Sequence, residues 1–248
     1  MAENFWTLDR IAEALAPLSP VNLPRGTSHV QRITTDTRSI QQGDAFLALK
    51  GERFDGHDFL VQAVESGATA LIVSAPPKVD SVGVPVFEVR DTLIALGALG
   101  TAWRRAWGKT IVGVAGSNGK TSTKDLIRAA LSEMYDVSAT TGNLNNRIGV
   151  PLSLLAIPAE SDIAVIELGT SLPGEVEILR EIVAPDIVVV TSIAEEHLEG
   201  LGDLSGVLRE EAAAYEGVAV GIAPAEQPEI GEAAKGKARK IVIAGLDT

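Results

Sequence analysis

The chain has 248 residues, of which 46% are hydrophobic and 22% charged, and it contains no cysteine. This length and composition allow one large or two ordinary soluble domains, and the lack of cysteine excludes disulfides and thiolate metal sites. The net charge of −12 opposes a general nucleic-acid binder, which needs a basic face to displace counterions. No run reaches membrane-spanning length and no leader pattern is present. We therefore expect a cytoplasmic monomer with no nucleic-acid partner and no membrane insertion.

Residues 1–90 predict a small α/β domain. Residues 7–16 form a helical pattern that Thr7 can cap, with one apolar stripe turned inward: Leu8, Ile11, Ala12 and Leu15. Short strands are predicted at 43–51, 69–74 and 84–89, and a second helix at 57–68. This domain contains no obvious catalytic cluster. Residues 91–108 predict a helix that bridges to the next domain.

From residue 109 to residue 248, apolar strands alternate with helices. Near-continuous Val/Ile runs are typical of strands buried on both faces, which indicates a mostly parallel sheet covered by helices. The predicted strands are 110–115, 162–168, 186–192, 217–223 and 240–245. The predicted fold class is therefore α/β, with a small N-terminal domain followed by a central domain that contains a phosphate-binding loop.

The segment after the first of these strands predicts that loop. Gly119, Lys120 and Thr121 match the end of the usual pattern, but the strict spacing requires glycine where Val114 stands. Small residues before a helix let backbone amides converge on a phosphate, Lys120 can neutralise it, and the Thr121 hydroxyl can reach magnesium. The alternative is an ordinary strand-to-helix turn. The candidate nucleotide-binding residues are Gly116, Ser117, Asn118, Gly119, Lys120, Thr121 and Ser122.

An acid and an imidazole follow the next two strands. Glu167 ends a run of Ile and Val, where a carboxylate is costly unless a cation meets it, and magnesium could be that cation. The alternative is a helix cap or an arginine partner. His197 is the only histidine in this half, and a lone histidine is more often a loop residue. Because parallel strands end at one edge of a sheet, we expect the loop, Glu167 and His197 to share a nucleotide-triphosphate site with catalytic roles for Lys120, Glu167 and His197.

Four separated motifs resemble the Mur ligases. These are GVAGSNGKTSTK, TTGNLNNRIGVPLSLL, IELGTSLPGE and TSIAEEHLEGLG, and residues 34–73 are similar to the N-terminal domain of the MurE and MurF branches. The GNLNNRIG stretch is similar to MurF, which adds D-alanyl-D-alanine to UDP-N-acetylmuramoyl-tripeptide. The resemblance implies an ATP- and Mg²⁺-dependent amide ligase of cell-wall (peptidoglycan) synthesis that forms an acyl phosphate. The alternatives are a MurE-type ligase and a binding module without ligase activity.

The resemblance also implies roles for individual residues. Thr121 and Glu167 would share one magnesium ion, and His197 would contact a second. The side of the muramoyl peptide would be lined by Asn143, Asn145, Asn146 and Thr170, and the uridine end by Thr37 and Arg38. Asparagines are also common turn formers, and Arg38 could be a surface charge. His57 is interpreted as a structural loop residue.

The sequence departs from the family pattern at three places. The family's carbamylated lysine falls at Glu211, and we expect this carboxylate, or Glu210 if the register slips, to serve as the magnesium ligand instead; a solvated helix face is the alternative. Residues 222–223 lack the asparagine associated with adenine, so no adenine contact is assigned there. A C-terminal ligase domain is not recognisable before Thr248, and we expect the chain to be a fragment.

Overall fold

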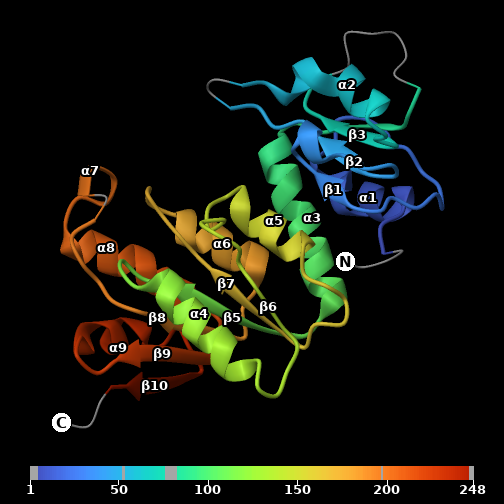
Figure 1. Ribbon diagram of the computed structural model, residues 1–248. Helices are drawn as coiled ribbons and strands as arrows, with labels where there is room; N and C mark the ends of the chain where they lie inside the picture. Colours follow the sequence, from blue (N-terminus) through green and yellow to red (C-terminus); the bar gives the residue numbers. More distant parts are fainter. Residues whose placement is uncertain (1–4, 52–53, 76–82, 197, 246–248) are drawn as a thin grey trace. The chain divides into compact units, whose positions relative to one another are not determined.

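A computed structural model describes residues 5–51, 54–75, 83–196 and 198–245. The chain divides into two compact units, residues 1–103 and 104–248 (Figure 1). Within the described residues, no helix is long and apolar enough to span a membrane. Both units are built on parallel sheets with helices, which confirms the predicted α/β class.

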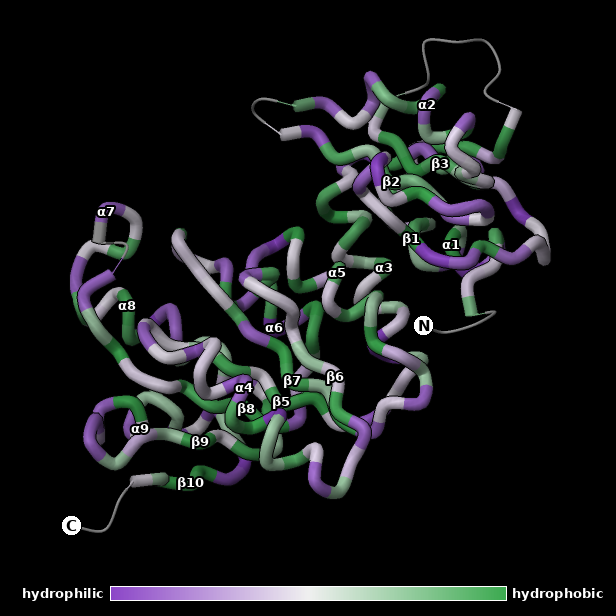
Figure 2. The backbone as a smooth tube through the Cα atoms, viewed as in Figure 1, coloured by the Kyte–Doolittle hydropathy of each residue, from purple (hydrophilic) through white to green (hydrophobic). Residues whose placement is uncertain are grey.

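The second unit is a six-stranded parallel sheet with the order β10-β9-β8-β5-β7-β6. Its strands are β5 (Thr110–Ala115), β6 (Val137–Ala139), β7 (Ile163–Glu167), β8 (Ile187–Val190), β9 (Val220–Pro224) and β10 (Lys240–Ala244). Figure 2 shows a hydrophobic band along β5, β7 and β8 at the middle of this sheet. These strands lie at the centre of a sheet that helices cover, which explains why their sequences are nearly continuous runs of Val and Ile.

Helices cover the sheet in two layers. They are α4 (Lys120–Leu131), α5 (Gly149–Leu155), α6 (Glu175–Val183), α7 (Leu198–Leu201), α8 (Leu204–Glu211), the 3-10 helix η4 (Ala212–Tyr215) and α9 (Pro228–Ala234). Helix α4 packs on β5, β6 and β7, whereas α5, α6, α8 and α9 form a layer in which each contacts the next. Parallel crossovers are right-handed, so α4, whose connection runs the opposite way, lies on the other face.

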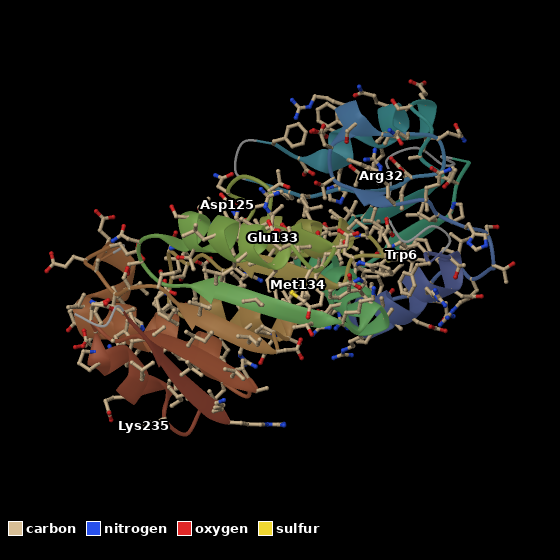
Figure 3. All side chains as sticks on the ribbon, turned by 60° about the horizontal axis from the view of Figure 1, so that its bottom comes forward. Trp6, Arg32, Asp125, Glu133, Met134 and Lys235 are labelled. Carbon is tan, nitrogen blue, oxygen red and sulfur yellow. The ribbon has the colours of Figure 1, made fainter. Side chains whose placement is uncertain are left out.

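One side of α4 faces away from the sheet. Lys124 is the only residue of this helix that is buried. Asp125, and Glu133 and Met134 just beyond the helix, lie on the outward side (Figure 3), where Met134 is 81% exposed. The inward side of the helix is held by buried Lys124 and by Ile127, which packs against the core residues Val112, Val114 and Val165.

Each of the five strands predicted for this unit overlaps an observed strand, but β6 was missed. Its three residues lie at the edge of the sheet and are only partly buried. An edge strand this short lacks the apolar run that reveals the central strands. Its position matters, because the predicted substrate loop 140–146 follows it directly.

The first unit is a four-stranded parallel sheet with the order β1-β2-β3-β4. Its strands are β1 (Ile33–Thr34), β2 (Ala45–Leu47), β3 (Ala70–Val73) and β4 (Val86–Glu88). Its helices are α1 (Leu8–Leu15), α2 (Leu60–Glu65) and the first part of α3 (Thr92–Trp107), with 3-10 turns η1 (Ala16–Leu18), η2 (Thr37–Ser39) and η3 (Gly56–Phe59). The predicted helix at 7–16 is confirmed: the Thr7 hydroxyl accepts a hydrogen bond from the Arg10 amide, and the four stripe residues are buried.

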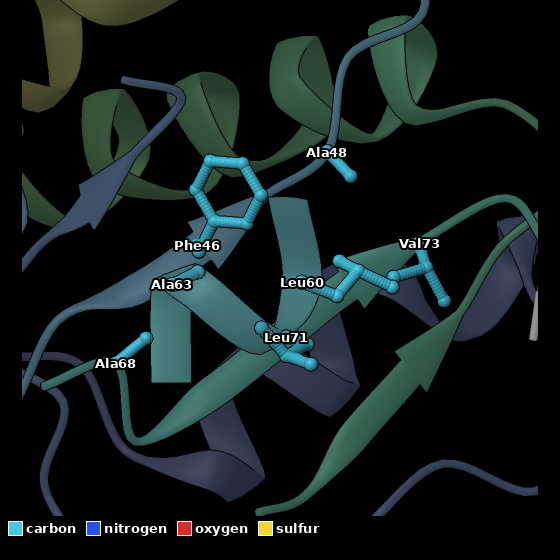
Figure 4. Close-up of a cluster of buried hydrophobic side chains, with 7 residues drawn as sticks. All are labelled: Phe46, Ala48, Leu60, Ala63, Ala68, Leu71 and Val73. Atoms are coloured by element: carbon cyan, nitrogen blue, oxygen red, sulfur yellow. The ribbon is translucent and has the colours of Figure 1, made fainter. Parts of the chain in front are cut away.

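One part of the core of this unit lies between α2 and a face of the sheet. Figure 4 shows the buried cluster, which is made of Phe46, Ala48, Leu60, Ala63, Ala68, Leu71 and Val73. His57 lies beside it and contacts Asp55 through Nδ1 at 2.6 Å and the Ser74 amide through Nε2 at 2.9 Å. Because Nε2 accepts from a backbone N–H, the ring fastens two loops together, in agreement with its interpretation as a structural residue.

Candidate functional site

The phosphate loop (residues 116–122) leaves the carboxyl end of β5 and enters α4. Gly116 has a φ of +114°, and a Cβ there would lie 2.5 Å from the Thr191 hydroxyl oxygen. Gly119 has a φ of +83° and is the N-cap of α4. Both positions therefore favour glycine. The loop leads directly into the N-terminus of α4, where backbone amides and the helix dipole favour an anion.

The segment that follows β8 fixes the loop in place. The Ser117 amide donates to the Ser192 carbonyl at 2.7 Å, and the Ser117 hydroxyl lies 3.0 Å from the Ala194 amide. The Thr191 hydroxyl donates to the Asn118 carbonyl at 2.7 Å. The loop and the end of β8 are thus one hydrogen-bonded assembly.

Lys120 folds back over the loop. Its Nζ donates to the carbonyls of Gly116 and Ser117, the latter at 3.0 Å. A compact ammonium beside this loop is chemically suited to a phosphate ligand, and the phosphate-binding role of Lys120 stays a prediction.

Glu167 lies at the end of β7, beside Thr121. The Thr121 hydroxyl donates to Glu167 Oε2 at 3.0 Å, and the Asn145 side-chain amide donates to Oε1 at 2.8 Å. Glu167 is only 2% exposed. Sequence reasoning anticipated a cation for this carboxylate, and the contacts found are a hydroxyl and an amide, which leave its charge available to a metal ion.

Two further residues position Glu167 and were not predicted. The Thr140 hydroxyl accepts from the Glu167 amide at 3.0 Å, and Lys124 Nζ donates to the Thr140 carbonyl at 2.8 Å. Both are almost completely buried. Lys124 is the fourth residue after Lys120 and faces the sheet, a pattern that helical periodicity alone could have suggested.

The other residues predicted for the muramoyl-peptide side have different surroundings. Asn146 Oδ1 accepts from the amides of Ile148 and Gly149 at the start of α5, which is the turn-forming alternative. Asn143 is exposed. Thr170 is 8% exposed, and its hydroxyl lies 3.2 Å from Glu210 Oε1. Of these four residues, the contacts link only Asn145 directly to Glu167.

Glu211 lies behind the phosphate loop. Its Oε2 accepts from the Gly116 amide at 2.6 Å, and its Oε1 is buried with no hydrogen-bond partner. Burial raises the pKa of this carboxyl from 4.5 to about 7, although the Gly116 amide and Lys120 act in the opposite direction. The residue is fully buried, which excludes the solvated helix face that was the alternative for it.

The predicted metal ligand His197 lies outside the described residues. Among the residues that are described, no cluster of three or more His, Asp or Glu side chains is arranged to hold a metal. The Thr121 hydroxyl and a Glu167 carboxylate oxygen lie 3.0 Å apart, and both are hard oxygen ligands of the kind that magnesium prefers.

A pocket of about 540 Å³ in the first unit contains Thr37 and Arg38. Arg38 is paired with Asp36 through two hydrogen bonds of 2.9 and 2.7 Å, which lower the pKa of Asp36 to about 2. The pocket also contains a stacked aromatic pair, Phe54 and Phe59, whose ring centres are 4.8 Å apart. Sequence reasoning missed this pair, because the 3-10 turn η3 lies between Phe54 and its own last residue, Phe59, and brings the two rings together.

Gln227 is another residue that the sequence did not reveal. Its side-chain amide pairs with both the N–H and the C=O of Ile193, each at 2.8 Å. These two hydrogen bonds have the same pattern as those between neighbouring β-strands, and they hold residue 193 in place.

Family comparisons cover most of the chain. Residues 114–248 match the Mur ligase middle domain, and residues 29–104 match the Mur ligase family catalytic domain. The UDP-N-acetylmuramoyl-tripeptide–D-alanyl-D-alanine ligase of Bacillus subtilis is 44% identical over 182 residues, which is 72% of this chain and 39% of that protein. The chain thus spans about two fifths of the length of this curated relative.

Comparison with solved structures agrees with these sequence matches. A crystal structure of MurF from Acinetobacter baumannii is similar with a TM-score of 0.85 and 35% identity, over 97% of this chain and 53% of that one. A MurF ligase from Thermotoga maritima in complex with ADP is similar with a TM-score of 0.81 and 29% identity, over 89% of this chain and 51% of that one.

Proposed function

The chain belongs to the Mur ligase family, as its motifs suggested, and we propose that it is the substrate- and nucleotide-binding part of a MurF-type ligase. In this proposal the enzyme uses ATP to join D-alanyl-D-alanine to UDP-N-acetylmuramoyl-tripeptide in the cytoplasm. The observation that carries it is the meeting of Lys120, Thr121 and Glu167 at the carboxyl ends of β5 and β7. The MurF relatives and the ADP-bound neighbour support the same assignment.

The phosphate loop would hold ATP. Its glycine-dependent backbone presents amides to the phosphates, and Lys120 would neutralise the terminal ones. Thr121 and Glu167 would hold a magnesium ion together with phosphate oxygens, which spreads the charge of the triphosphate. The sequence also predicted His197 and Glu211 as magnesium ligands; His197 lies outside the described residues, and Oε1 of Glu211 is buried with no hydrogen-bond partner.

In this reaction the main task of the site would be to position two anions, the tripeptide carboxylate and the terminal phosphate of ATP. A carboxylate oxygen of the tripeptide forms a bond to the terminal phosphorus of ATP, and ADP leaves. The amine of the dipeptide then attacks the acyl carbon and loses a proton, and inorganic phosphate leaves. A loop that fixes the phosphate and a buried acid network that fixes Asn145 beside it supply orientation and charge neutralisation.

The first unit would bind the UDP end of the substrate. Thr37 and Arg38 line its pocket, and the exposed face of Phe54 offers a stacking surface for a flat base. Because Arg38 is already paired with Asp36, it would meet the ligand as part of a neutral pair. Asn143 and Asn145 would face the muramoyl peptide, with Asn146 and Thr170 shaping the loops around it.

A phosphate-release assay tests the proposal. The chain is mixed with ATP, Mg²⁺ and UDP-muramoyl-tripeptide, with and without D-alanyl-D-alanine, and ADP binding is measured in parallel. Release that depends on the dipeptide supports the ligase. Release driven by a single amino acid instead supports a MurE-type enzyme. Binding without turnover supports a binding module. Absence of nucleotide binding would refute the proposal.

A further inference from the structure

Helix α8 ends in two adjacent carboxylates that are both buried. Glu210 is 8% exposed and Glu211 is completely buried. Successive residues of a helix point about 100° apart, so the two side chains reach different segments of the unit. Buried carboxylates are costly unless they are hydrogen-bonded, so each must be fixed by what it contacts.

Glu211 contacts the phosphate loop across 95 positions of sequence. Its Oε2 accepts from the Gly116 amide at 2.6 Å. Gly116 is the residue whose positive φ turns the chain out of β5 and into the loop. The hydrogen bond therefore acts on the backbone at the point where the loop conformation is set.

Glu210 contacts the loop that follows β7. Its Oε2 accepts from the Gly174 amide at 2.7 Å, and its Oε1 accepts from the Val176 amide at 2.8 Å and lies 3.2 Å from the Thr170 hydroxyl. Gly174 is the N-cap of α6, so this carboxylate satisfies amides that the helix itself leaves unpaired. The loop it holds begins two residues after Glu167.

We propose that Glu210 and Glu211 are positioning residues that act from α8 on the two loops of the site. Glu211 holds the phosphate loop in the conformation that binds nucleotide, through Gly116. Glu210 holds the loop 169–174, next to Glu167, and the first turn of α6. Thr170 then contributes by fastening this loop to α8. The inference deepens the proposed function and rests on it for the identity of the nucleotide.

Two substitutions of Glu211 separate this role from that of a magnesium ligand. Glu211→Gln keeps an oxygen that accepts from the Gly116 amide but removes the charge. Glu211→Leu has a similar size and leaves that amide unpaired in a buried place. Glu216→Leu is the matched control, because Glu216 is an exposed glutamate on the turn that follows η4.

Titration of each variant with ADP, once with Mg²⁺ and once with EDTA, gives the first readout. We expect Glu211→Gln to bind within about threefold of the wild type, and Glu211→Leu to bind about tenfold or more weakly, in both buffers. Equal losses for the two variants in Mg²⁺ that vanish in EDTA would overturn the proposal in favour of a metal ligand. Identical binding by all variants would also overturn it. A wild type that binds no ADP would instead refute the proposed function.

Amide hydrogen exchange gives a second readout that needs no ligand. We expect Glu211→Leu to speed exchange in peptides that cover 113–120, and Glu210→Gln to speed it in peptides that cover 169–178. Glutamine at position 210 must place its NH₂ against one of the two amide donors, so the hydrogen bonding cannot be restored by rotation. Exchange that is unchanged in both segments, or raised equally in both by either variant, would overturn the assignment.

Discussion

The stability of the metal-free protein should depend on pH through Glu211. Burial is the main cause that raises its pKa from 4.5 to about 7. Between these values the folded protein holds a proton that the unfolded chain has released. The contribution to stability is therefore complete below about pH 4.5 and is lost as pH rises through about 7. At about 1.4 kcal/mol per unit, the shift corresponds to about 3 kcal/mol.

Urea denaturation at intervals from pH 4 to 8.5, without nucleotide or divalent metal, measures this effect. We expect the free energy of unfolding of the wild type to fall relative to that of Glu211→Gln by about 3 kcal/mol as pH rises, and the difference to become constant above about pH 8. Glu216→Gln is the control and should stay parallel to the wild type at every pH. A difference between wild type and Glu211→Gln that does not change with pH would refute the reasoning.

Three further substitutions test the site and the pocket of the first unit. Gly116→Ala should abolish ADP binding and lower Tm by several degrees, since a Cβ would lie 2.5 Å from the Thr191 hydroxyl oxygen; binding like that of the wild type would contradict this. Thr121→Val should cost about tenfold or more in the Mg²⁺-dependent part of ADP affinity, because it removes the hydroxyl beside Glu167, whereas Thr121→Ser should retain it; calorimetry with and without Mg²⁺ checks the pair. Phe54→Ala should weaken UDP binding by about fivefold or more without a change in ADP affinity, and unchanged UDP titrations would exclude a stacking role.

The strands that carry the site could be predicted because buried strands have locally apolar sequences. Runs such as 110–115 and 186–192 are mainly apolar. Such a run predicts both a strand and its position at the centre of the sheet. The phosphate loop could also be predicted, since glycine, lysine and threonine at fixed offsets depend only on the strand-to-helix turn. Strand β6 could not, because three partly buried edge residues carry no such pattern.

Contacts between distant segments were predicted less well. Glu167 was recognised as an acid in need of a partner. The Thr140 hydroxyl, which accepts a hydrogen bond from the Glu167 backbone amide, could not be inferred from the sequence around position 140. Asn146 shows the opposite case: its two local hydrogen bonds at the start of α5 follow from turn chemistry that was named as an alternative. Local rules therefore identified the side chains, and tertiary packing decided which of them reach the site.

The order of the strands explains why such distant residues meet. Strand β5 lies between β7 and β8, and the chain leaves β5 toward β6 but returns from β7 toward β8. Loops that follow strands on the two sides of such a reversal diverge and leave room for a ligand at the carboxyl edge. The phosphate loop therefore has the Glu167 segment on one side and residues 191–194 on the other. Helix α8 comes after β8 in the chain and contacts α6, so it can reach both the loop and the β7 side. The two carboxylates at its end are thus placed to hold both loops of the site, one through Gly116 and the other through Gly174 and Val176.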